Sequence, residues 1–230
     1  MLQIDKLSVH YGGLAALKEV SLLIQTGELI SIVGANGAGK TTLLKAISGA
    51  VATQGDVWFQ DVNVSSDKAY VRARRGIVHV PQGRHIFSSL SVEENLLVAC
   101  TYRGSRSSLD KVYELFPALF AKRRQNAGEL SGGQQQMVAI GRGIMSDPLL
   151  LMLDEPSTGI SPTLIDDIFA AILKLHASYR MALVLVEQRA TTALEISSRA
   201  YVLEQGRIVV QGLSAELRVD DRVRKAYLGV

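Results

Sequence analysis

Cysteine, long apolar runs and excess charge are all scarce in this sequence. Its 230 residues include a single cysteine, Cys100, so no disulfide can form within the chain, as is typical of a reducing compartment. The longest apolar runs, at 149–153 and 182–186, are only as long as a strand, whereas a membrane-spanning helix needs about 20 predominantly apolar residues. The first residues, MLQIDKL, include an acid and alternate in polarity, unlike a signal peptide. We therefore expect a cytosolic chain that does not cross a membrane by itself.

The charge of the chain is close to balanced. It has 25 Lys and Arg against 22 Asp and Glu, a formal net charge of +3, which is too small to indicate a nucleic-acid partner. With 47% hydrophobic and 20% charged residues, the composition excludes intrinsic disorder and indicates a folded globular protein.

Apolar patterns along the chain predict alternating strands and helices. Strands are expected at 3–9, 20–24, 29–34, 55–59, 77–80, 149–153, 181–186, 200–204 and 207–211. Helices are expected at 41–49, 69–75, 108–116, 162–176 and 189–196, with two more beginning at Ser91 and Gly133. This order predicts one α/β domain over residues 1–230, with a mostly parallel sheet flanked by helices. The early strands predict an antiparallel β subdomain, and residues 88–140 predict an inserted helical lobe.

The strongest motif is a glycine-rich loop that matches GxxxxGK[ST] at Gly34–Thr41. It lies between a predicted strand and a predicted helix, the context in which such a loop holds a phosphate chain on its backbone N–H groups. Lys40 is then expected to reach the β- and γ-phosphates, and the Thr41 hydroxyl to hold Mg²⁺. The alternative is a chance glycine-rich turn, which both flanking elements argue against.

Two acidic residues follow the apolar segment at 149–153. In a P-loop enzyme, Asp154 would contact Mg²⁺, directly or through water, and Glu155 would polarise the attacking water. The two acids can have different roles because neighbouring side chains at the end of a strand point in different directions. Taken without the glycine loop, the two would be ordinary solvated acids.

A second glycine-bearing helix start occurs at LSGGQ, residues 130–134. Ser131 and the glycines could form a second phosphate-sized nest, or simply an entry turn into a helix. If it binds phosphate, either one site uses both helix starts or the second serves a nucleotide held by another chain.

Together these motifs resemble those of the ATP-binding subunits of ABC transporters. The order and spacing of Gly34–Thr41, Gln82, LSGGQ and LLLMLDEP fit that family over nearly the whole chain. The strings VPQGRHIF, SVEENL, YELFP, EPSTGISP, LVEQ and the terminal AYLG resemble more narrowly the shorter ATPase of bacterial high-affinity branched-chain amino-acid uptake systems. Urea and short-chain amide uptake ATPases share several of these strings. The resemblance implies a P-loop NTPase fold of ABC type, with ATP and Mg²⁺ as cofactors.

The resemblance also implies roles for individual residues. Tyr11 would stack on adenine, and Gln82 would reach Mg²⁺ and the attacking water. The phosphate loop and the start of its helix would comprise Gly34, Ala35, Asn36, Gly37, Ala38, Gly39, Lys40, Thr41 and Thr42. Four residues would close over the γ-phosphate of the ATP bound by the other subunit: Ser131, Gly132, Gly133 and Gln134. Two chains would then sandwich two nucleotides.

Two positions depart from the common pattern of that family. Gln188 stands where a switch histidine usually follows the last core strand, and Ser161-Pro162 stands where an aspartate is usual. A glutamine amide can donate a hydrogen bond to the γ-phosphate but cannot titrate. We therefore expect slow hydrolysis at this site, and a heterodimer with a faster second ATP-binding subunit rather than a homodimer.

The expected partners are membrane permease subunits and, indirectly, a periplasmic binding protein, at the cytoplasmic face of a bacterial inner membrane. Ile86, Phe87 and Leu90 are either core of the helical lobe or the place where the membrane partner docks. A soluble ABC ATPase acting on nucleic acid is the alternative from another class, but the chain has neither long coiled coils nor a tandem cassette.

The remaining residues indicate no further site. The four histidines, including His79, are scattered without metal-ligand spacing, and Trp58 is expected in the core.

Overall fold

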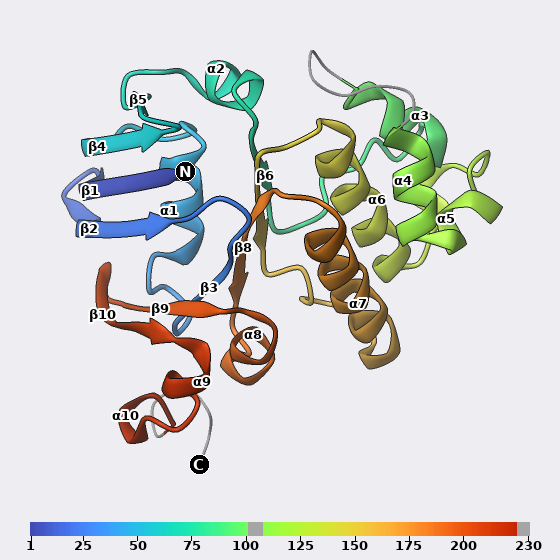
Figure 1. The fold of residues 1–230 in the computed structure, drawn as a ribbon. Helices are drawn as coiled ribbons and strands as arrows, with labels where there is room; N and C mark the ends of the chain where they lie inside the picture. Colours follow the sequence, from blue (N-terminus) through green and yellow to red (C-terminus); the bar gives the residue numbers. More distant parts are fainter. Residues whose placement is uncertain (101–107, 225–230) are drawn as a thin grey trace.

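The computed structural model describes residues 1–100 and 108–224 and contains two β-sheets (Figure 1). The first is antiparallel with strand order β2-β1-β4-β5, and the second is mainly parallel with order β10-β9-β3-β8-β7-β6. The strands are β1 (Leu2–Tyr11), β2 (Leu14–Ile24), β3 (Leu29–Val33), β4 (Gln54–Phe59), β5 (Val62–Asn63), β6 (Ile77–Val80), β7 (Leu150–Asp154), β8 (Ala182–Glu187), β9 (Arg199–Glu204) and β10 (Arg207–Leu213). The described helices are α1 (Lys40–Ile47), α2 (Ala69–Arg74), α3 (Val92–Val98), α4 (Ser108–Leu115), α5 (Pro117–Ala121), α6 (Gly132–Met145), α7 (Pro162–Ser178), α8 (Ala190–Ile196), α9 (Ser214–Leu217), α10 (Asp221–Val223) and the 3-10 turn η1 (Ala127–Glu129).

The parallel sheet brings four loops to one edge of the molecule. β3 pairs in parallel with β8 and β9, and β7 pairs in parallel with β8 and β6. The segments that begin at Gly34, Pro81, Glu155 and Gln188 therefore all leave the sheet at its carboxyl edge, where ligands bind in open α/β sheets. The predicted α/β fold with a mostly parallel sheet is confirmed.

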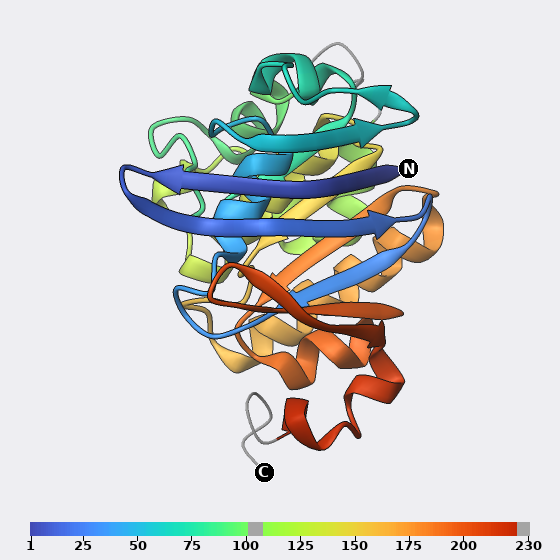
Figure 2. The same cartoon turned by 90° about the vertical axis from the view of Figure 1, so that its left-hand side faces the viewer.

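The two faces of this sheet have different covers. Ile32 and Met152 point to the core shared with α1 and the antiparallel sheet, which crosses in front of the parallel strands in Figure 2. Leu153 and Leu185 point to the opposite core, shared with α6, α7 and α8. One cover is therefore a helix together with a second sheet, rather than helices alone. Alternation along each buried strand sends successive apolar side chains to the two cores.

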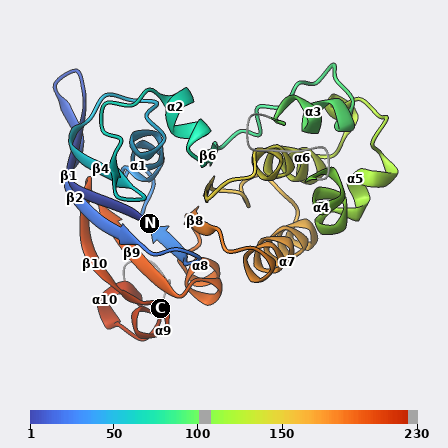
Figure 3. The same cartoon turned by 45° about the horizontal axis from the view of Figure 1, so that its top comes forward.

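The helical region, residues 92–145, lies on the side of the parallel sheet away from the antiparallel sheet (Figures 1 and 3). Its helices α3, α4 and α5 all pack against α6. Ser91 caps α3 and Ser131 caps α6, each with a capping box that uses the side chain three residues later. The helix α6 continues to Met145, beyond the expected end of the lobe at residue 140, because its apolar face packs on β6 and β7.

Some local expectations were incomplete or wrong. β2 begins at Leu14, six positions before the predicted start, and pairs along nearly the whole of β1. Trp58 is 40% exposed rather than in the core, because it lies between the inward-facing Val57 and Phe59 on β4. The terminal AYLG string lies outside the described residues.

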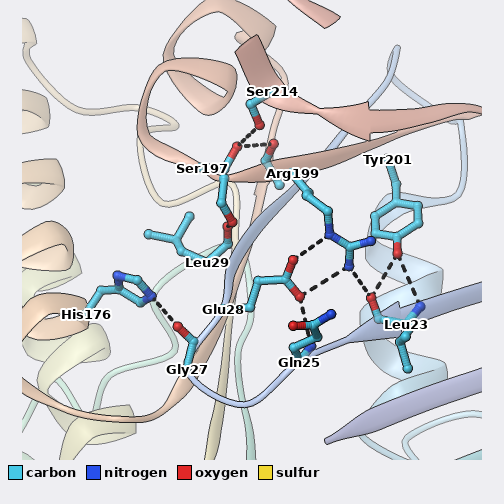
Figure 4. Close-up of polar contacts among 12 residues, drawn as sticks. Leu23, Gln25, Gly27, Glu28, Leu29, His176, Ser197, Arg199, Tyr201 and Ser214 are labelled. Carbon is cyan, nitrogen blue, oxygen red and sulfur yellow. Dashed lines mark hydrogen bonds and ion pairs between the residues drawn. The ribbon is translucent and has the colours of Figure 1, made fainter. Parts of the chain in front are cut away.

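The two sheets are joined by a network of polar contacts (Figure 4). The Arg199 guanidinium on β9 donates to the Glu28 carboxylate and to the Leu23 carbonyl, and the Tyr201 hydroxyl donates to that same carbonyl at 2.8 Å. The Glu28 carboxylate in turn accepts from the Gln25 N–H at 2.8 Å. These contacts fix the crossover from β2 to β3, and so the start of the strand that leads into the glycine loop.

Candidate functional site

The glycine loop runs from the end of β3 to the first turn of α1. Gly39 precedes α1 with φ of 107°, and a Cβ there would lie 2.8 Å from the Ala16 carbonyl oxygen. Only glycine fits both the conformation and the space. The loop therefore curls tightly enough to direct the unpaired N–H groups of the first turn of α1 toward one point.

Lys40, the first residue of α1, is buried and turned toward the loop. Its ammonium donates to the Gly34 and Ala35 carbonyls at 2.7 and 3.1 Å and lies 3.6 Å from a Glu155 oxygen. The adjacent Thr41 hydroxyl donates to Asp154 Oδ1 at 3.2 Å. The glycine loop and the two acids after β7, which are more than a hundred positions apart in the chain, thus form one cluster.

Glu155 is held by groups from three loops. Besides the Lys40 contact, its Oε2 accepts from Gln82 Nε2 at 3.0 Å and from the Thr158 hydroxyl at 3.1 Å. Gln82 follows β6, so the carboxyl ends of neighbouring parallel strands place the amide beside the acid. Asp154 is buried beneath it, with 1% of its surface exposed.

These groups line one cavity of about 790 Å³, here called the Lys40 cavity. The lining includes most of the residues singled out from the sequence: Tyr11, Asn36, Gly37, Gly39, Lys40, Thr41, Thr42, Gln82, Glu155 and Gln188. Gly34, Ala35, Ala38 and Asp154 belong to the same loops but are not part of the lining. Sequence reasoning missed the lining residues of β2 and of the turn after β9, among them Lys18, Gln205 and Gly206, because no motif marks them.

Ser131, Gly132, Gly133 and Gln134 do not line the Lys40 cavity. The Ser131 hydroxyl accepts from the Gln134 N–H and the Gln134 side chain accepts from the Ser131 N–H. A Cβ at Gly133 would lie 2.5 Å from Leu164 Cδ1, so this glycine allows close packing of α6 on α7. The Arg84 guanidinium donates to Gln135 and to the Gly159 carbonyl, which ties the Gln82 loop to this helix start.

The apolar segment after Gln82 divides into buried and exposed parts. Phe87 is 45% exposed, whereas Ile86 packs against the helical core. The buried Asn95 amide donates to the Phe87 and Leu90 carbonyls and accepts from the Phe87 N–H, and so fixes this turn. The Arg142 guanidinium lies 4.7 Å above the Phe87 ring. A cavity of about 240 Å³ lies beside them and includes His79, Arg84, His85 and Arg142, but not the three apolar residues.

Glu187 is a buried acid that the sequence did not single out. Its carboxylate accepts from the Ser157 hydroxyl at 2.9 Å and from the Ser157 N–H at 3.2 Å. Burial raises the pKa of Glu187, while the hydrogen bonds from Ser157 act in the opposite direction. The pair joins the segment after Glu155 to the end of β8, next to Gln188.

A glycine loop with a buried lysine, an adjacent threonine hydroxyl and two acids at the next strand end define the chain as a P-loop nucleoside triphosphatase. A sequence profile of the family described as "ABC transporter" matches residues 17–158. The High-affinity branched-chain amino acid transport ATP-binding protein BraG of Pseudomonas aeruginosa is 44% identical to it, with both chains covered completely. The Probable branched-chain amino acid transport ATP-binding protein LivF of Archaeoglobus fulgidus is 36% identical, covering 100% of this chain and 99% of the relative.

Among solved structures, the ADP conformation of an ATP-binding cassette of an ABC transporter is 27% identical, with a TM-score of 0.86 over 100% of this chain and 99% of that one. The chain therefore belongs to the ABC transporter family, as an ATP-binding cassette. The predicted P-loop NTPase fold of ABC type, and the prediction of a transport ATPase, are confirmed. None of the helices in the described part of the chain is both long and apolar enough to span a bilayer.

Proposed function

We propose that this chain hydrolyses ATP to power the import of branched-chain amino acids through separate membrane permease subunits. The observation that carries the proposal is the Lys40 cavity, where the glycine loop, the buried Lys40 and the hydrogen-bonded carboxylate of Glu155 meet. The substrate class follows from relatives named for branched-chain amino acid transport that match along their whole length.

ATP would lie in the Lys40 cavity with its phosphates on the loop from Gly34 to Gly39 and the first turn of α1, including Thr42. Lys40 would leave the loop carbonyls for the β- and γ-phosphates, since a buried ammonium gains more from a phosphate than from neutral carbonyls. Tyr11 also lines the cavity and is 47% exposed, so adenine would stack on its ring.

The oxygen atoms beside Lys40 fit a magnesium ion. Asp154 Oδ2 is buried and has no hydrogen-bond partner among the described residues, and hard divalent ions prefer such oxygen ligands. Thr41, Gln82 and Asp154 would hold the metal, directly or through water. When bound, the ion would supply positive charge that offsets the negative charge of the phosphates.

Glu155 would polarise the attacking water while ATP and water become ADP and phosphate. Gln82 and Thr158 hold its carboxylate at the inner end of the cavity, which limits the orientations that it can take. Gln188, at the end of β8, would donate a hydrogen bond to the γ-phosphate.

Ser131, Gly132, Gly133 and Gln134 would act on a nucleotide bound by another cassette. They begin α6, so the helix N-terminus and the N–H groups of its first turn favour an anion, yet they lie outside their own chain's cavity. A dimer that sandwiches two nucleotides satisfies both observations. The slow site expected from Gln188 favours a heterodimer with a second ATP-binding subunit.

The chain would work as a peripheral protein at the cytoplasmic face of the inner membrane. Phe87 offers an exposed aromatic ring on a turn held by Asn95, and such anchors are typical of protein interfaces. The permease subunits would dock there, and the periplasmic binding protein would act through them.

The test is transport by the purified complex in proteoliposomes with ATP on the cassette side. We expect leucine uptake that requires a leucine-binding protein, and a loss of ATPase by a factor of about 10² to 10⁴ in Glu155→Gln. Thr163→Ala, in the exposed first turn of α7, is the matched control and should keep wild-type activity.

Uptake of urea or a short-chain amide in place of leucine would reassign the substrate but keep the cassette function. Salt-sensitive nucleic-acid binding without any permease partner would contradict the transport role.

A further inference from the structure

His79 faces the proposed magnesium ligand from the neighbouring strand. β6 and β7 pair in parallel, with His79 opposite Met152. The imidazole Nε2 lies 3.8 Å from Asp154 Oδ2, and the two side chains are 10% and 0% exposed. The pairing of the strands, and not any spacing in the sequence, brings these two groups together.

Both facing atoms are buried without a hydrogen-bond partner among the described residues. A buried polar atom without a hydrogen-bond partner destabilises the fold, so two such atoms that face each other are expected to form a hydrogen bond. The distance of 3.8 Å exceeds a normal hydrogen bond by less than about 1 Å, and it is too short for a water molecule in between. His79 also lines the cavity beside Arg142, which leaves space for its ring to move.

The other oxygen of Asp154 already has a partner. Oδ1 accepts from the Thr41 hydroxyl at 3.2 Å, which leaves Oδ2 as the oxygen without a partner. Its two lone pairs allow it to accept one hydrogen bond and still contact a metal ion. Carboxylates that bind metals are themselves held by outer hydrogen bonds, and the loss of such a partner typically weakens metal binding by about 10- to 100-fold.

We propose that His79 is a positioning residue for Asp154. The imidazole, with a proton on Nε2, donates a hydrogen bond to Asp154 Oδ2 and so fixes the orientation of the carboxylate toward the metal. The proton remains on His79 throughout. This inference rests on the proposed role of Asp154 as a magnesium ligand.

The experiment measures Mn²⁺ affinity by electron paramagnetic resonance, with ATP present and hydrolysis stopped by Glu155→Gln. In that background, His79→Phe should weaken Mn²⁺ binding by about tenfold or more, while ATP affinity without metal stays unchanged. His79→Gln, which keeps an amide donor, should restore the affinity to within a few-fold. His85→Phe is the matched control, because His85 lines the same cavity but is exposed and makes no contact with Asp154.

Unchanged Mn²⁺ affinity in His79→Phe would overturn the proposal. Failure of the Glu155→Gln parent itself to bind Mn²⁺ with ATP would instead contradict the metal site of the proposed function. A second measurement needs no substitution at His79: nitrogen-15 NMR of the full chain should show Nε2 protonated in the presence of Mg²⁺ and ATP. An unprotonated Nε2 would overturn the proposal.

Discussion

At the scale of single residues, the site depends on the position of one carboxylate. Glu155 contacts Lys40, Gln82 and Thr158, which come from three segments that meet at the carboxyl edge of the parallel sheet. A ligand that attracts Lys40 away from Glu155 would leave the acid held by two neutral donors. The same movement would thus prepare the phosphate contact and free a carboxylate oxygen for water.

We expect Gln188 to limit the rate of hydrolysis at this site. A protonated histidine would provide a charge-assisted hydrogen bond, about twice as strong as the neutral amide bond. We expect Gln188→His to raise the ATPase rate of the isolated chain several-fold, up to about tenfold for roughly 1.4 kcal/mol. Gln211→His, at an exposed position on β10 outside the lining of the Lys40 cavity, should leave the rate unchanged. A rate that stays the same in Gln188→His would show that this position does not contact the developing charge.

Glu187 makes stability depend on pH in a predictable direction. Burial raises its pKa in the folded state, so the folded chain holds this proton more tightly than the unfolded chain does. The resulting stabilisation is complete below the unfolded pKa and is lost as pH rises through the folded pKa. Relative to Glu187→Gln, the wild type should therefore gain free energy of unfolding as the pH falls from neutrality toward 4.5, the ordinary pKa of a glutamate, measured by urea titration. A wild type that instead loses free energy of unfolding relative to Glu187→Gln as the pH falls would contradict the raised pKa of Glu187.

At the scale of elements, the sequence predicted those features that local patterns determine. The glycine loop, the strand before Asp154 and the helix begun by Ser131 each have a signature within a few residues, and the structure places all three at the expected elements. Contacts between distant strands carry no such signature. No spacing in the sequence marks His79, because its proximity to Asp154 exists only through the pairing of β6 with β7.

Arg72 shows the same limit, since its charge predicts a surface position but it is 1% exposed. Its guanidinium donates to the Ala46, Ile47 and Ser65 carbonyls at 2.8 to 2.9 Å and so anchors the end of α1 opposite the phosphate loop.

Removal of that anchor should destabilise the fold. Arg72→Met removes the guanidinium donors of the Ile47 and Ser65 carbonyls, while the Ala46 carbonyl keeps the Gly49 N–H. We expect a loss of about 3 kcal/mol or more in the free energy of unfolding. Arg75→Met removes only a half-exposed ion pair with Asp67, which is worth about 0–1 kcal/mol. Chemical denaturation compares the two variants. Equal losses of free energy of unfolding in both variants would mean that the Arg72 hydrogen bonds stabilise the fold no more than the exposed ion pair does.

The exposed turn at Phe87 should affect the coupling of ATP hydrolysis to transport, and not the hydrolysis itself. In the assembled complex, Phe87→Ala should lower transport by about tenfold or more, as loss of an interface anchor does, while the ATPase of the isolated chain stays within about two-fold. Tyr70→Ala, which removes another exposed aromatic side chain, on α2, is the control and should affect neither. Normal transport by Phe87→Ala would exclude this turn as the docking point.

At the scale of the whole molecule, the two groups of residues that we propose for nucleotide binding do not meet within one chain. The Lys40 cavity is lined by residues of β2 and of the loops at the carboxyl edge of the parallel sheet, whereas Ser131 and Gly133 stand at the start of α6. Figure 3 shows α6 in the helical region, on the side away from the antiparallel sheet. A complete site would therefore need a second cassette, to which this chain contributes the start of α6. With Gln188 slowing its own site, its larger contribution would be to the site of a faster sister subunit.

The most direct measurement is the ATP affinity of Lys40→Ala, by calorimetry on the isolated chain. Lys40 is the buried cation beside the glycine loop, and loss of a charged hydrogen-bonding group of about 1.5–3 kcal/mol corresponds to about a 10- to 100-fold weaker affinity. Lys45→Ala, an exposed lysine on the same helix, should bind ATP as the wild type does. A Lys40→Ala variant that folds and binds ATP with unchanged affinity would contradict the assignment of this cavity to ATP.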